Sequence, residues 1–471
     1  MIMIELINTI AMVTNQFVLF YFIAINFGYT VLLILSAIAL VRHKRALHWS
    51  AFDLLLRDEE APGVGVVMPV HNEEAGVAIA VRAVLNLNYP NFEVIVVNDG
   101  SKDSTMAVLK EKFRLVPTAR FTKKHIDTKP VRAVYRSLSV PSLSVIDKEN
   151  GGKADSINAG INACRMPYVC AIDGDVILEQ DALLRIMQPI SQDPERIAAI
   201  GGIVRVANGC LVKHGKIIEP RLPKEALPMF QVVEYMRAFL SARTGLPMLN
   251  ALPLVSGAFG VFAHRHIVAV GGFNTSTVGE DMEIICAIHE KLKTQGRDYR
   301  ILFAADPVCW TEVPSSMAIL GNQRRRWHRG LMETLSIHKK MIFNPRFGAL
   351  GVGSLPFFYF FEGWGPIVEL LGYFSFAVSI IMGWVDYPFA LTFLTMAVAW
   401  GILLSLCSVL MDEFSFRRYT RWNDMLRMVL YAFLENLGYR QLNTLFRVQG
   451  LWKYLTGAKG WGEMTRTGLG S

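Results

Sequence analysis

The sequence predicts a mixed α/β domain of about 250 residues, joined on both sides to helices that lie in a membrane. Three observations support this fold class. Hydrophobic residues make up 52% of the 471 residues and charged residues only 19%, so part of the chain must face lipid. Several apolar runs are long enough to cross a bilayer. Between them, residues 63 to 315 alternate short apolar runs with helical patterns and carry interspersed charges, as expected for a sheet covered by helices.

The first long apolar run, Phe17 to Val41, predicts a transmembrane helix. At a rise of about 1.5 Å per residue it is long enough to cross about 30 Å of hydrocarbon. The basic residues Arg42 to Arg45 follow this run, whereas a cleaved signal peptide has its basic residues in front. By the positive-inside rule, the N-terminus should lie outside and the chain from residue 46 onward in the cytosol.

Residues 63 to 315 predict a mixed α/β sheet. Val64 to Val70 and Phe92 to Val97 are short apolar runs, and Glu74 to Leu87 between them has helical apolar spacing. Strand, helix and strand in this order predict a right-handed parallel crossover. The strand pattern continues at Val169 to Ile172 and Ala198 to Val206.

After Glu312 the composition again suits a membrane. Gln323 to Phe343 mixes basic and apolar residues, which is typical of a helix in the membrane interface. Gly363 to Trp384 and Tyr387 to Met411 predict two spans, and the turn between them should be external because it has no basic residue.

Asp424 to Phe446 is apolar but contains Glu435, Asn436, Tyr439 and Arg440. Such residues usually face a bundle interior or a wet cavity. We interpret this segment as a fourth span that lines a pore, with an interfacial helix as the alternative. The resulting division of the chain is an N-terminal segment and transmembrane helix (1–46), a linker (47–62), a cytosolic domain (63–315), amphipathic interfacial helices (316–348), a C-terminal transmembrane region (349–449) and a tail (450–471).

The net charge of +8 does not indicate nucleic-acid binding, because the basic residues gather beside apolar stretches. These clusters are Arg42 to Arg45, Arg324 to Arg329 and Arg417 to Arg421, which fits the positive-inside bias of membrane proteins. The six cysteines form no CxxC pair, so we expect reduced, buried thiols rather than a zinc site or a disulfide framework.

Carboxylates collect where predicted strands end, which is where open α/β sheets bind ligands. Asp99 lies at one such end. Asp173 and Asp175 flank a glycine directly after an apolar strand and are suited to holding Mg²⁺ or Mn²⁺ against a diphosphate, with a plain turn as the alternative. Glu280 and Asp281 open an apolar helix, where they either complement the helix dipole or supply a general base.

One helix should carry Gln323, Arg326 and Trp327. A guanidinium fork and an indole suit a diphosphate and a sugar face, and an interfacial anchor is the alternative for Trp327. The run Gly151-Gly152-Lys153-Ala154 lacks the GxxxxGK[ST] form, and no GxGxxG follows the first strand. Neither an ATPase nor a dinucleotide site is therefore predicted.

Taken in order, these segments resemble the family 2 glycosyltransferases, and in particular the membrane synthases of cellulose, chitin, hyaluronan and poly-N-acetylglucosamine. The similarity runs from about residue 60 to residue 450 and implies a GT-A fold, a Rossmann-like mixed sheet. It rests on Val66 to Glu73, Val97 to Ser101, Gly152 to Ala154, Asp173 to Asp175, Gly279 to Asp281 and Gln323 to Trp327.

The resemblance also implies roles for the nucleotide-binding residues. Asp99 would contact the uridine base, Glu73 would shape the same pocket, and Lys153 would contact the diphosphate. Asp173 and Asp175 match the DxD pair, with Asp175 the more direct ligand of Mg²⁺ or Mn²⁺.

A second group of residues would serve the acceptor. Asp281 would take the proton from the acceptor hydroxyl, with Glu280 beside it in the substrate site. Gln323, Arg326 and Trp327 match the QxxRW motif that holds the diphosphate and the acceptor sugar. One base suffices for direct inversion at the anomeric carbon, whereas a hydrolase would need two carboxylates that flank the bond.

The resulting hypothesis is an inverting, metal-dependent transferase in the plasma (inner) membrane. It would add sugar from a cytosolic UDP-sugar to a growing β-linked exopolysaccharide and pass the polymer through its own spans. Transfer of a single sugar to a lipid-linked acceptor is the alternative, and a membrane scaffold with a degenerate transferase domain is a third. The short tail cannot hold the cyclic di-guanylate-binding domain of bacterial cellulose synthases, and accessory export subunits cannot be recognised from one sequence.

Overall fold

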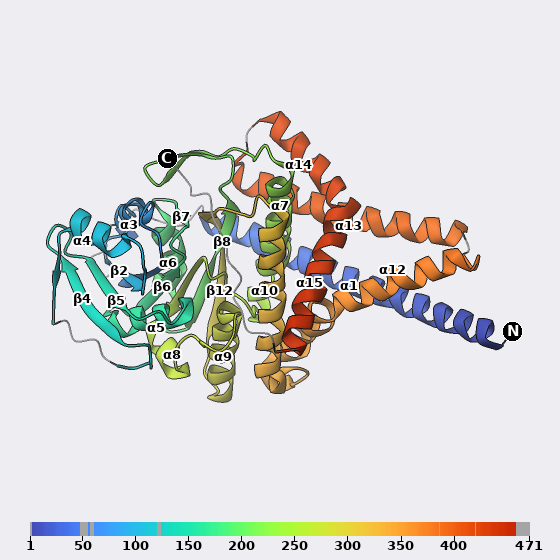
Figure 1. The fold of residues 1–471 in the computed structure, drawn as a ribbon, viewed down its shortest axis with the longest axis horizontal. Coiled ribbons are helices and arrows are strands. Elements are labelled where there is room, and N and C mark those ends of the chain that lie inside the picture. Colours follow the sequence, from blue (N-terminus) through green and yellow to red (C-terminus); the bar gives the residue numbers. More distant parts are fainter. Residues whose placement is uncertain are drawn as a thin grey trace.

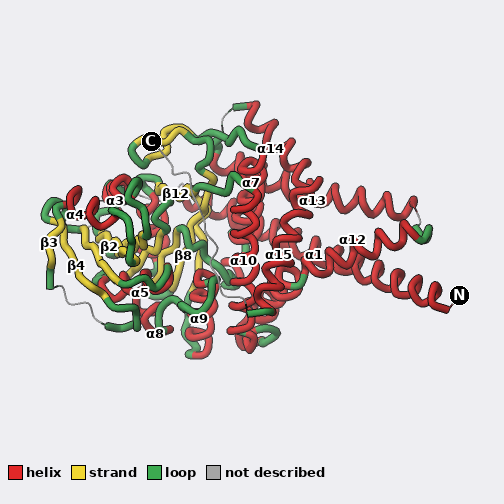
Figure 2. The backbone as a smooth tube through the Cα atoms, in the orientation of Figure 1, coloured by secondary structure: helices red, strands yellow, loops and turns green. Residues whose placement is uncertain are grey.

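The computed structural model describes residues 2–47, 55–56, 61–119, 124–385, 387–419 and 421–457. A sheet with helices on both faces forms one half of the molecule. Long helices extend from the opposite side, and further helices lie in between (Figure 1; strands and helices are separated by colour in Figure 2). The predicted linker and tail lie largely outside the described residues.

The main sheet is mixed, with ten strands in the order β3-β4-β5-β2-β1-β6-β11-β8-β12-β7. Strands β5, β2, β1 and β6 are parallel neighbours, β12 is parallel to β8, and β11 is antiparallel to both β6 and β8. This arrangement confirms the predicted GT-A-like fold class. The strands are β1 (Val64–Val70), β2 (Phe92–Asp99), β3 (Leu115–Pro117), β4 (Val131–Ser137), β5 (Leu143–Lys148), β6 (Tyr168–Ile172), β7 (Ile177–Leu178), β8 (Ile197–Val206), β11 (Phe259–Ala263) and β12 (Arg300–Thr311), and a separate hairpin contains β9 (Leu211–Lys213) and β10 (Lys216–Glu219).

The central strands are buried on both faces, which explains their uninterrupted apolar sequences. Side chains alternate along a strand. Val66 and Met68 of β1 therefore join one core and Val67 the other, and Val96 and Ile95 of β2 divide in the same way. The first core contains α3 (Val77–Leu85), α4 (Thr105–Phe113) and α6 (Ala182–Gln192), and the second contains α5 (Lys153–Ala163) and α9 (Glu280–Thr294).

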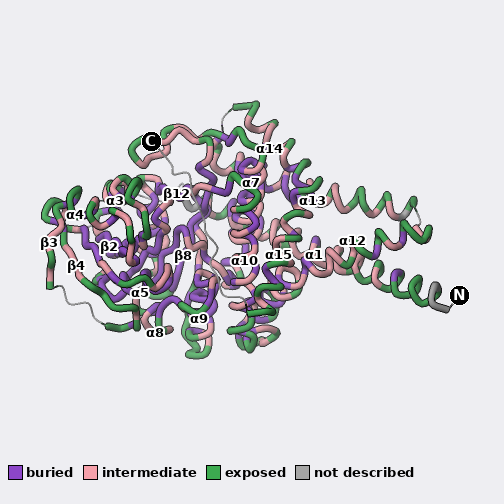
Figure 3. Tube along the Cα trace, viewed as in Figure 1, coloured by how far each residue is buried: buried purple, intermediate pink, exposed green. Residues whose placement is uncertain are grey.

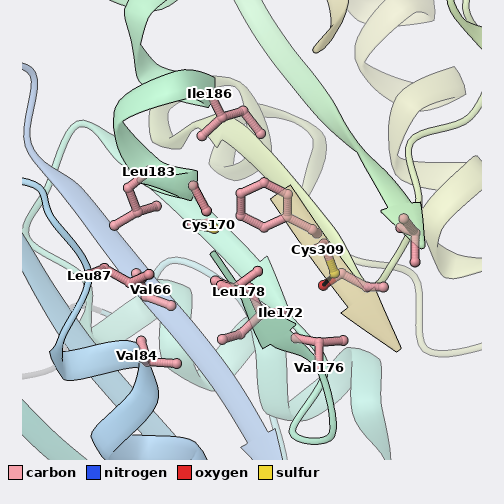
Figure 4. Close-up of a cluster of buried hydrophobic side chains, with 14 of the residues drawn as sticks. Val66, Val84, Leu87, Cys170, Ile172, Val176, Leu178, Leu183, Ile186 and Cys309 are labelled. Carbon is pink, nitrogen blue, oxygen red and sulfur yellow. Dashed lines mark hydrogen bonds between the residues drawn. The ribbon is translucent and has the colours of Figure 1, made fainter. Parts of the chain in front are cut away.

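The two cores are the most completely buried part of the molecule (Figure 3). Figure 4 shows the first of them at close range. Val84 of α3, Val66 of β1, Ile172 of β6 and Ile186 of α6 converge there. A strand contributes to both cores at once, so a one-residue slip in its register would turn apolar side chains away from both helical layers.

The predicted helix from Glu74 to Leu87 begins later than expected, at Val77. The preceding residues form a turn in which side chains of α4 and its approach accept backbone hydrogen bonds. The amide of Glu73 donates to Thr105 Oγ1 (2.8 Å) and that of Glu74 to Asp103 Oδ2 (3.1 Å). These two hydrogen bonds fix the residues after β1 as a turn.

Two helices are long and apolar enough to cross a membrane, and a bent pair would make a third. They are found within α1 (Ile2–Leu47), within α13 (Tyr387–Phe416), and in the pair 350–363 and 365–381, which bends by 41°. The second arm of that pair is α12 (Gly365–Ile381). Helix α1 exposes large apolar side chains such as Phe20 (72%) and Phe27 (66%), as expected of a surface that faces lipid.

The segment predicted as a fourth span, Asp424 to Phe446, is not one continuous helix. This segment is two helices, α14 (Trp422–Leu434) and α15 (Arg440–Leu455), separated by a break with non-helical torsion angles at Leu437 and Gly438. Neither helix is among those long and apolar enough to span. The buried carboxylate of Glu435 pairs with Arg237 and with Arg440 (3.1 Å) and accepts from Ser405 (2.6 Å). These polar contacts therefore join the helix junction to segments that are distant in the sequence.

Helices α7 (Ala226–Met236), α10 (Met317–Ile337) and α15 stand between the sheet and the long helices (Figure 1). Helix α10 carries the predicted amphipathic segment and packs along α15. The two approach closely at Gly450, where a Cβ would lie 2.6 Å from the carbonyl oxygen of Arg325. Further helical elements are α8 (His264–Val270), α11 (Leu355–Phe357), the π-helical turns 237–243, 350–354, 358–363 and 435–439, and the 3₁₀ turns 246–249, 339–341 and 345–347.

Candidate active site

The candidate site lies where elements that are distant in sequence meet at one edge of the sheet. Strand β6 ends one residue before Asp173, α5 begins at Lys153, and α9 begins at Glu280. The loop before β11 adds Gly257. A pocket at this point is lined by side chains from these elements, namely Lys153, Ile157, Ala171, Val255, Ser256, Gly257, Phe262, Phe273, Glu280 and Asp281.

Lys153 joins the carboxylates of this site. Its Nζ lies 2.5 Å from Asp173 Oδ1 and 3.6 Å from Glu280 Oε1, and it donates to the carbonyl oxygen of Gly257 (3.3 Å). Burial alone would lower the pKa of Lys153, but Asp173 and Glu280 outweigh it, so the pKa is raised. The ammonium is therefore retained at neutral pH.

Glu280 and Asp281 differ in their surroundings. Burial raises the pKa of Glu280, with Lys153 opposing the shift and Asp281 adding to it. Asp281 Oδ2 accepts a hydrogen bond from the Gly257 amide (3.3 Å), and its Oδ1 accepts one from the Met282 amide (2.9 Å). The Asp281 carboxylate therefore faces the loop before β11 and the pocket, at the positive end of the α9 dipole.

Glu73 approaches the Asp173 to Asp175 turn. A Cβ on Gly174 would lie 3.1 Å from both Oε1 and Oε2 of Glu73, so glycine lets this carboxylate come close. Hard carboxylate oxygens are the ligands that Mg²⁺ and Mn²⁺ prefer, and the donors here fit such an ion. Among the described residues no group of three or more His, Cys, Asp or Glu could hold a metal. Phosphate oxygens of a substrate would have to complete the coordination, as is usual for Mg²⁺.

Asp99 is buried at the end of β2, with both carboxylate oxygens bound by the chain itself. Oδ1 accepts from Lys148 Nζ (2.7 Å) and the Gly151 amide (2.9 Å), and Oδ2 accepts from the Gly152 amide (2.8 Å). These bonds order the loop that leads into Lys153. The predicted contact with a uridine base stays a prediction, since in this structure the carboxylate holds the loop.

Helix α10 is held against the start of α9 by two glycines. A Cβ on Gly279 would lie 2.7 Å from the Gly330 carbonyl oxygen, and one on Gly330 would lie 2.8 Å from the Gly279 Cα. Glu333 of α10 fastens the same turn, because its Oε2 accepts from Thr277 Oγ1 (2.8 Å) and the Val278 amide (3.0 Å). Helices α9 and α10 thus form one unit at the site.

The three predicted site residues of α10, Gln323, Arg326 and Trp327, have different surroundings. The pKa of Glu280 is raised overall by burial, and the charge of Arg326 is among the influences that oppose this rise. Trp327 is 42% exposed. Gln323 Oε1 is buried and accepts no hydrogen bond from the described part of the chain.

Sequence reasoning missed Arg243. Its guanidinium carbon lies 4.4 Å from the centroid of the Phe239 ring. Burial lowers the pKa of Arg243, and the charge of Asp281 opposes that shift. In the sequence Arg243 is only a basic residue in a largely apolar stretch, and nothing in that pattern singled it out.

Two family models match the chain. The model described as glycosyl transferase family 2 matches residues 65–231, and the one described as glycosyl transferase family group 2 matches residues 168–405. The chain belongs to the family 2 glycosyltransferases. Together the matches run through the candidate site as far as α13, and they confirm the resemblance carried by the sequence motifs.

Among curated proteins, this glycosyltransferase is similar to poly-beta-1,6-N-acetyl-D-glucosamine synthases. It is 27% identical over 285 residues to the Staphylococcus epidermidis protein, covering 60% of this chain and 58% of the relative. It is 27% identical over 278 residues to the Staphylococcus aureus (strain COL) protein, covering 59% and 56%. The chain thus spans less than two thirds of the length of these relatives.

Among solved structures, the glycosyltransferase is similar to the mannosyltransferase PcManGT from Pyrobaculum calidifontis in complex with GDP-Man and Mn²⁺. The identity is 16% and the TM-score is 0.47, and the match covers 88% of this chain and 99% of the other.

Proposed function

We propose that the protein is an inverting, metal-dependent transferase that adds sugars from a UDP-sugar to a growing β-linked polysaccharide. The observation that carries the proposal is the convergence of Lys153, Asp173, Glu280 and Asp281 at one edge of the sheet. The set contains a retained cation, hard oxygen donors and a carboxylate aimed at a pocket, as transfer from a nucleotide diphosphate requires. The similarity to poly-beta-1,6-N-acetyl-D-glucosamine synthases favours UDP-N-acetylglucosamine as the donor.

In this proposal Lys153 and Arg326 bind the diphosphate. Transfer leaves negative charge on the departing phosphate, and cations fixed in a water-poor site stabilise it without having to reorganise. Asp173 and Asp175 would hold Mg²⁺ or Mn²⁺, which supplies further charge neutralisation when bound. Asp99 supports this arrangement by ordering the loop before Lys153.

Asp281 is the proposed general base. Its carboxylate is kept in place by the Gly257 and Met282 amides and would accept the proton of the acceptor hydroxyl as that oxygen attacks the anomeric carbon. Glu280, whose pKa is raised by burial, would be the poorer anion of the two at neutral pH. A single base on the acceptor side is consistent with one displacement and inversion.

Trp327 is the proposed acceptor platform. Helix α10 lies between the sheet and the long apolar helices (Figure 1), so a saccharide that leaves the site toward the membrane would pass along it. An indole offers a large apolar face to the CH groups of a sugar. Passage of the polymer across the membrane is part of the proposal, with the catalytic domain in the cytosol of a bacterial-type plasma (inner) membrane and the lipid bilayer around α1, α12 and α13.

The proposal is tested by product size. Purified protein in detergent is incubated with UDP-N-acetylglucosamine, UDP-glucose or UDP-glucuronic acid and Mg²⁺ or Mn²⁺, and the products are sized after lipid extraction. We expect a long polymer from UDP-N-acetylglucosamine. A lipid-soluble product carrying one sugar would instead establish the single-transfer alternative, and hydrolysis without any transfer product would reject both.

A further inference from the structure

Arg324 lies one helical turn before Trp327 on α10 and has no part in the proposed chemistry. We propose that Arg324, held by Glu234 and Tyr439, is a positioning residue that fixes the Trp327 indole for the acceptor sugar. This inference rests on the proposed acceptor role of Trp327. It adds that Arg324 holds the indole in the orientation that binds the sugar.

The first observation is the geometry of the arginine itself. Arg324 is 6% exposed, and its two terminal nitrogens each reach one oxygen of Glu234, with Nη1 to Oε1 and Nη2 to Oε2 both 2.8 Å. A two-pronged pair of this kind fixes the plane of the guanidinium as well as its position. The guanidinium carbon lies 4.5 Å from the centroid of the Trp327 ring, well inside the range of a cation–π contact.

The second observation is that Glu234 is itself held from another side. Its Oε2 accepts a hydrogen bond from the Tyr439 hydroxyl (2.6 Å). The Tyr439 ring stacks on Phe230 of α7, with centroids 4.8 Å apart and planes at 13°. Tyr439 follows directly after the break at Leu437 and Gly438. The change of chain direction there brings the Tyr439 ring against α7. Three separate elements therefore converge on the guanidinium that lies against Trp327.

The neighbouring arginine shows that this arrangement is specific to one position. Arg325 turns toward α15, donating to Gln449 Oε1 (2.7 Å) and to Asn322 Oδ1 (2.6 Å). Its guanidinium carbon lies 5.7 Å from the Phe446 ring. Arg325 has the same charge and the same helix but a different set of partners, which makes it a matched control.

A half-exposed indole that is free to rotate would lose side-chain entropy on binding a sugar. A guanidinium clamped against the ring removes part of that freedom before the acceptor arrives. Lysine at position 324 keeps the charge opposite Glu234 but cannot form the two-pronged pair or lie flat on the ring. The expected defect is in acceptor affinity, because neither the diphosphate contacts nor Asp281 are touched.

The test measures acceptor KM and kcat with UDP-N-acetylglucosamine and a short β-1,6-linked N-acetylglucosamine oligosaccharide, together with UDP affinity by calorimetry. We expect Arg324→Lys to raise the acceptor KM about 10-fold, and Tyr439→Phe about 3-fold, with kcat and UDP affinity changed less than about 2-fold. Arg325→Lys should leave all three quantities as in the wild type. Tyr439→Phe removes a single hydroxyl and keeps the test valid if Arg324→Lys fails to fold.

A double-mutant cycle then separates positioning from general stability. In a Trp327→Ala background, adding Arg324→Lys should change the acceptor KM less than about 2-fold, because its target is gone. If Arg324→Lys added the same factor in both backgrounds, the positioning role would be overturned while the acceptor role of Trp327 stood. If Trp327→Ala itself left the acceptor KM unchanged, the acceptor role and this inference would both be overturned.

Discussion

Glu280 and Asp281 are adjacent at the start of α9, but their different surroundings give the two carboxylates different properties. Glu280 is buried against Lys153 and its pKa is raised. Asp281 is bound by the Gly257 and Met282 amides and lines the pocket. The local sequence pattern does not separate the two, because either is a good first-turn residue of a helix, and only the family resemblance assigned the base to Asp281. The hydrogen bonds of Asp281 make it the better candidate for the base.

Asp281→Asn should leave UDP binding nearly intact and reduce transfer by about 100-fold or more, because an amide cannot accept the acceptor's proton. UDP affinity by calorimetry and product formation are measured on the same sample. Asp127→Asn is the control, since Asp127 is an exposed surface acid whose ion partner is the also exposed Lys124. Wild-type turnover in Asp281→Asn would return Asp281 to a purely structural role at the helix start.

Asp175→Asn should nearly abolish activity at saturating UDP-sugar, because a diphosphate leaving group in a site shielded from water needs charge compensation. The measurement is turnover as a function of Mg²⁺ and of Mn²⁺ for the variant and the wild type. Wild-type activity should disappear in excess EDTA and return when either ion is added back. Full turnover in EDTA would show that the carboxylates at Asp173 and Asp175 do not serve a metal.

At the scale of elements, α9 and α10 are joined at both ends. Gly279 and Gly330 pack backbone to backbone near the site. At the far end, His338 Nδ1 lies 2.7 Å from Glu290 Oε2 and its Nε2 lies 3.4 Å from Glu283 Oε1, while Lys340 pairs with Glu290 (2.5 Å). His338 therefore joins the end of α10 to α9, the helix that carries Asp281.

The contacts of His338 should make the free energy of unfolding depend on pH. Burial would lower the pKa of His338, but the nearby carboxylates of Glu283 and Glu290 outweigh burial, and the pKa is raised. A raised pKa means that the protonated form favours the folded state. The contribution is complete below the unfolded pKa of about 6.5 and is lost as the pH rises through the folded value.

His338→Gln should therefore lower the melting temperature in detergent by about 2–4 °C at pH 6 and by less at pH 9, which corresponds to roughly 1 kcal/mol in a domain of this size. His125→Gln is the control, because His125 is exposed. An equal loss at both pH values would indicate that the His338 ring contributes packing only.

The strands and helices whose sequence pattern is continuous along the chain could be predicted from the sequence. The apolar runs of β1, β2, β6 and β8 and the long apolar helices were recognisable because burial on both faces, or exposure to lipid, leaves a continuous apolar sequence. The break between α14 and α15 was not predicted, because the apolar pattern of Asp424 to Phe446 does not reveal that Gly438 adopts a φ of 105°. The Glu435 partners, Arg237 and Ser405, come from segments far away in the sequence.

The site was predicted at the level of residue types but not of contacts. Asp173, Lys153, Glu280 and Asp281 do meet; the carboxylates were expected from their places in the predicted elements, and Lys153 only from the family resemblance. The engagement of Asp99 with Lys148, and the clamp on Arg324, depend on which side chains face each other across the fold. No spacing along the chain carries that information.

At the scale of the whole molecule, the direction of the chain across the membrane remains a prediction. The basic residues at the end of α1 and after α13 predict that the catalytic domain lies in the cytosol. The turn between α12 and α13 should then be external, and Tyr387 at its edge is 68% exposed. Both sides of the membrane can be probed with single cysteines.

In a background that lacks the two partly exposed thiols, Cys210 and Cys407, Tyr387→Cys should react with a membrane-impermeant maleimide in intact spheroplasts. Lys112→Cys on α4 should react only after the membrane is opened. Labelling is read by mass shift on a gel. The reverse pattern would invert the orientation and place the proposed UDP-sugar site on the wrong side.

The ion pairs between the catalytic domain and the last helices bear on the order of events during synthesis. Arg205 of β8 pairs with Asp412, and Arg237 pairs with Glu435. The ribosome makes each arginine long before its carboxylate, and an unpaired buried charge costs several kcal/mol. We therefore expect the catalytic domain to reach its final packing only after Glu435 has been translated. A chain that stops before Asp412 would lack both carboxylate partners, so we expect its two arginines to stay uncompensated.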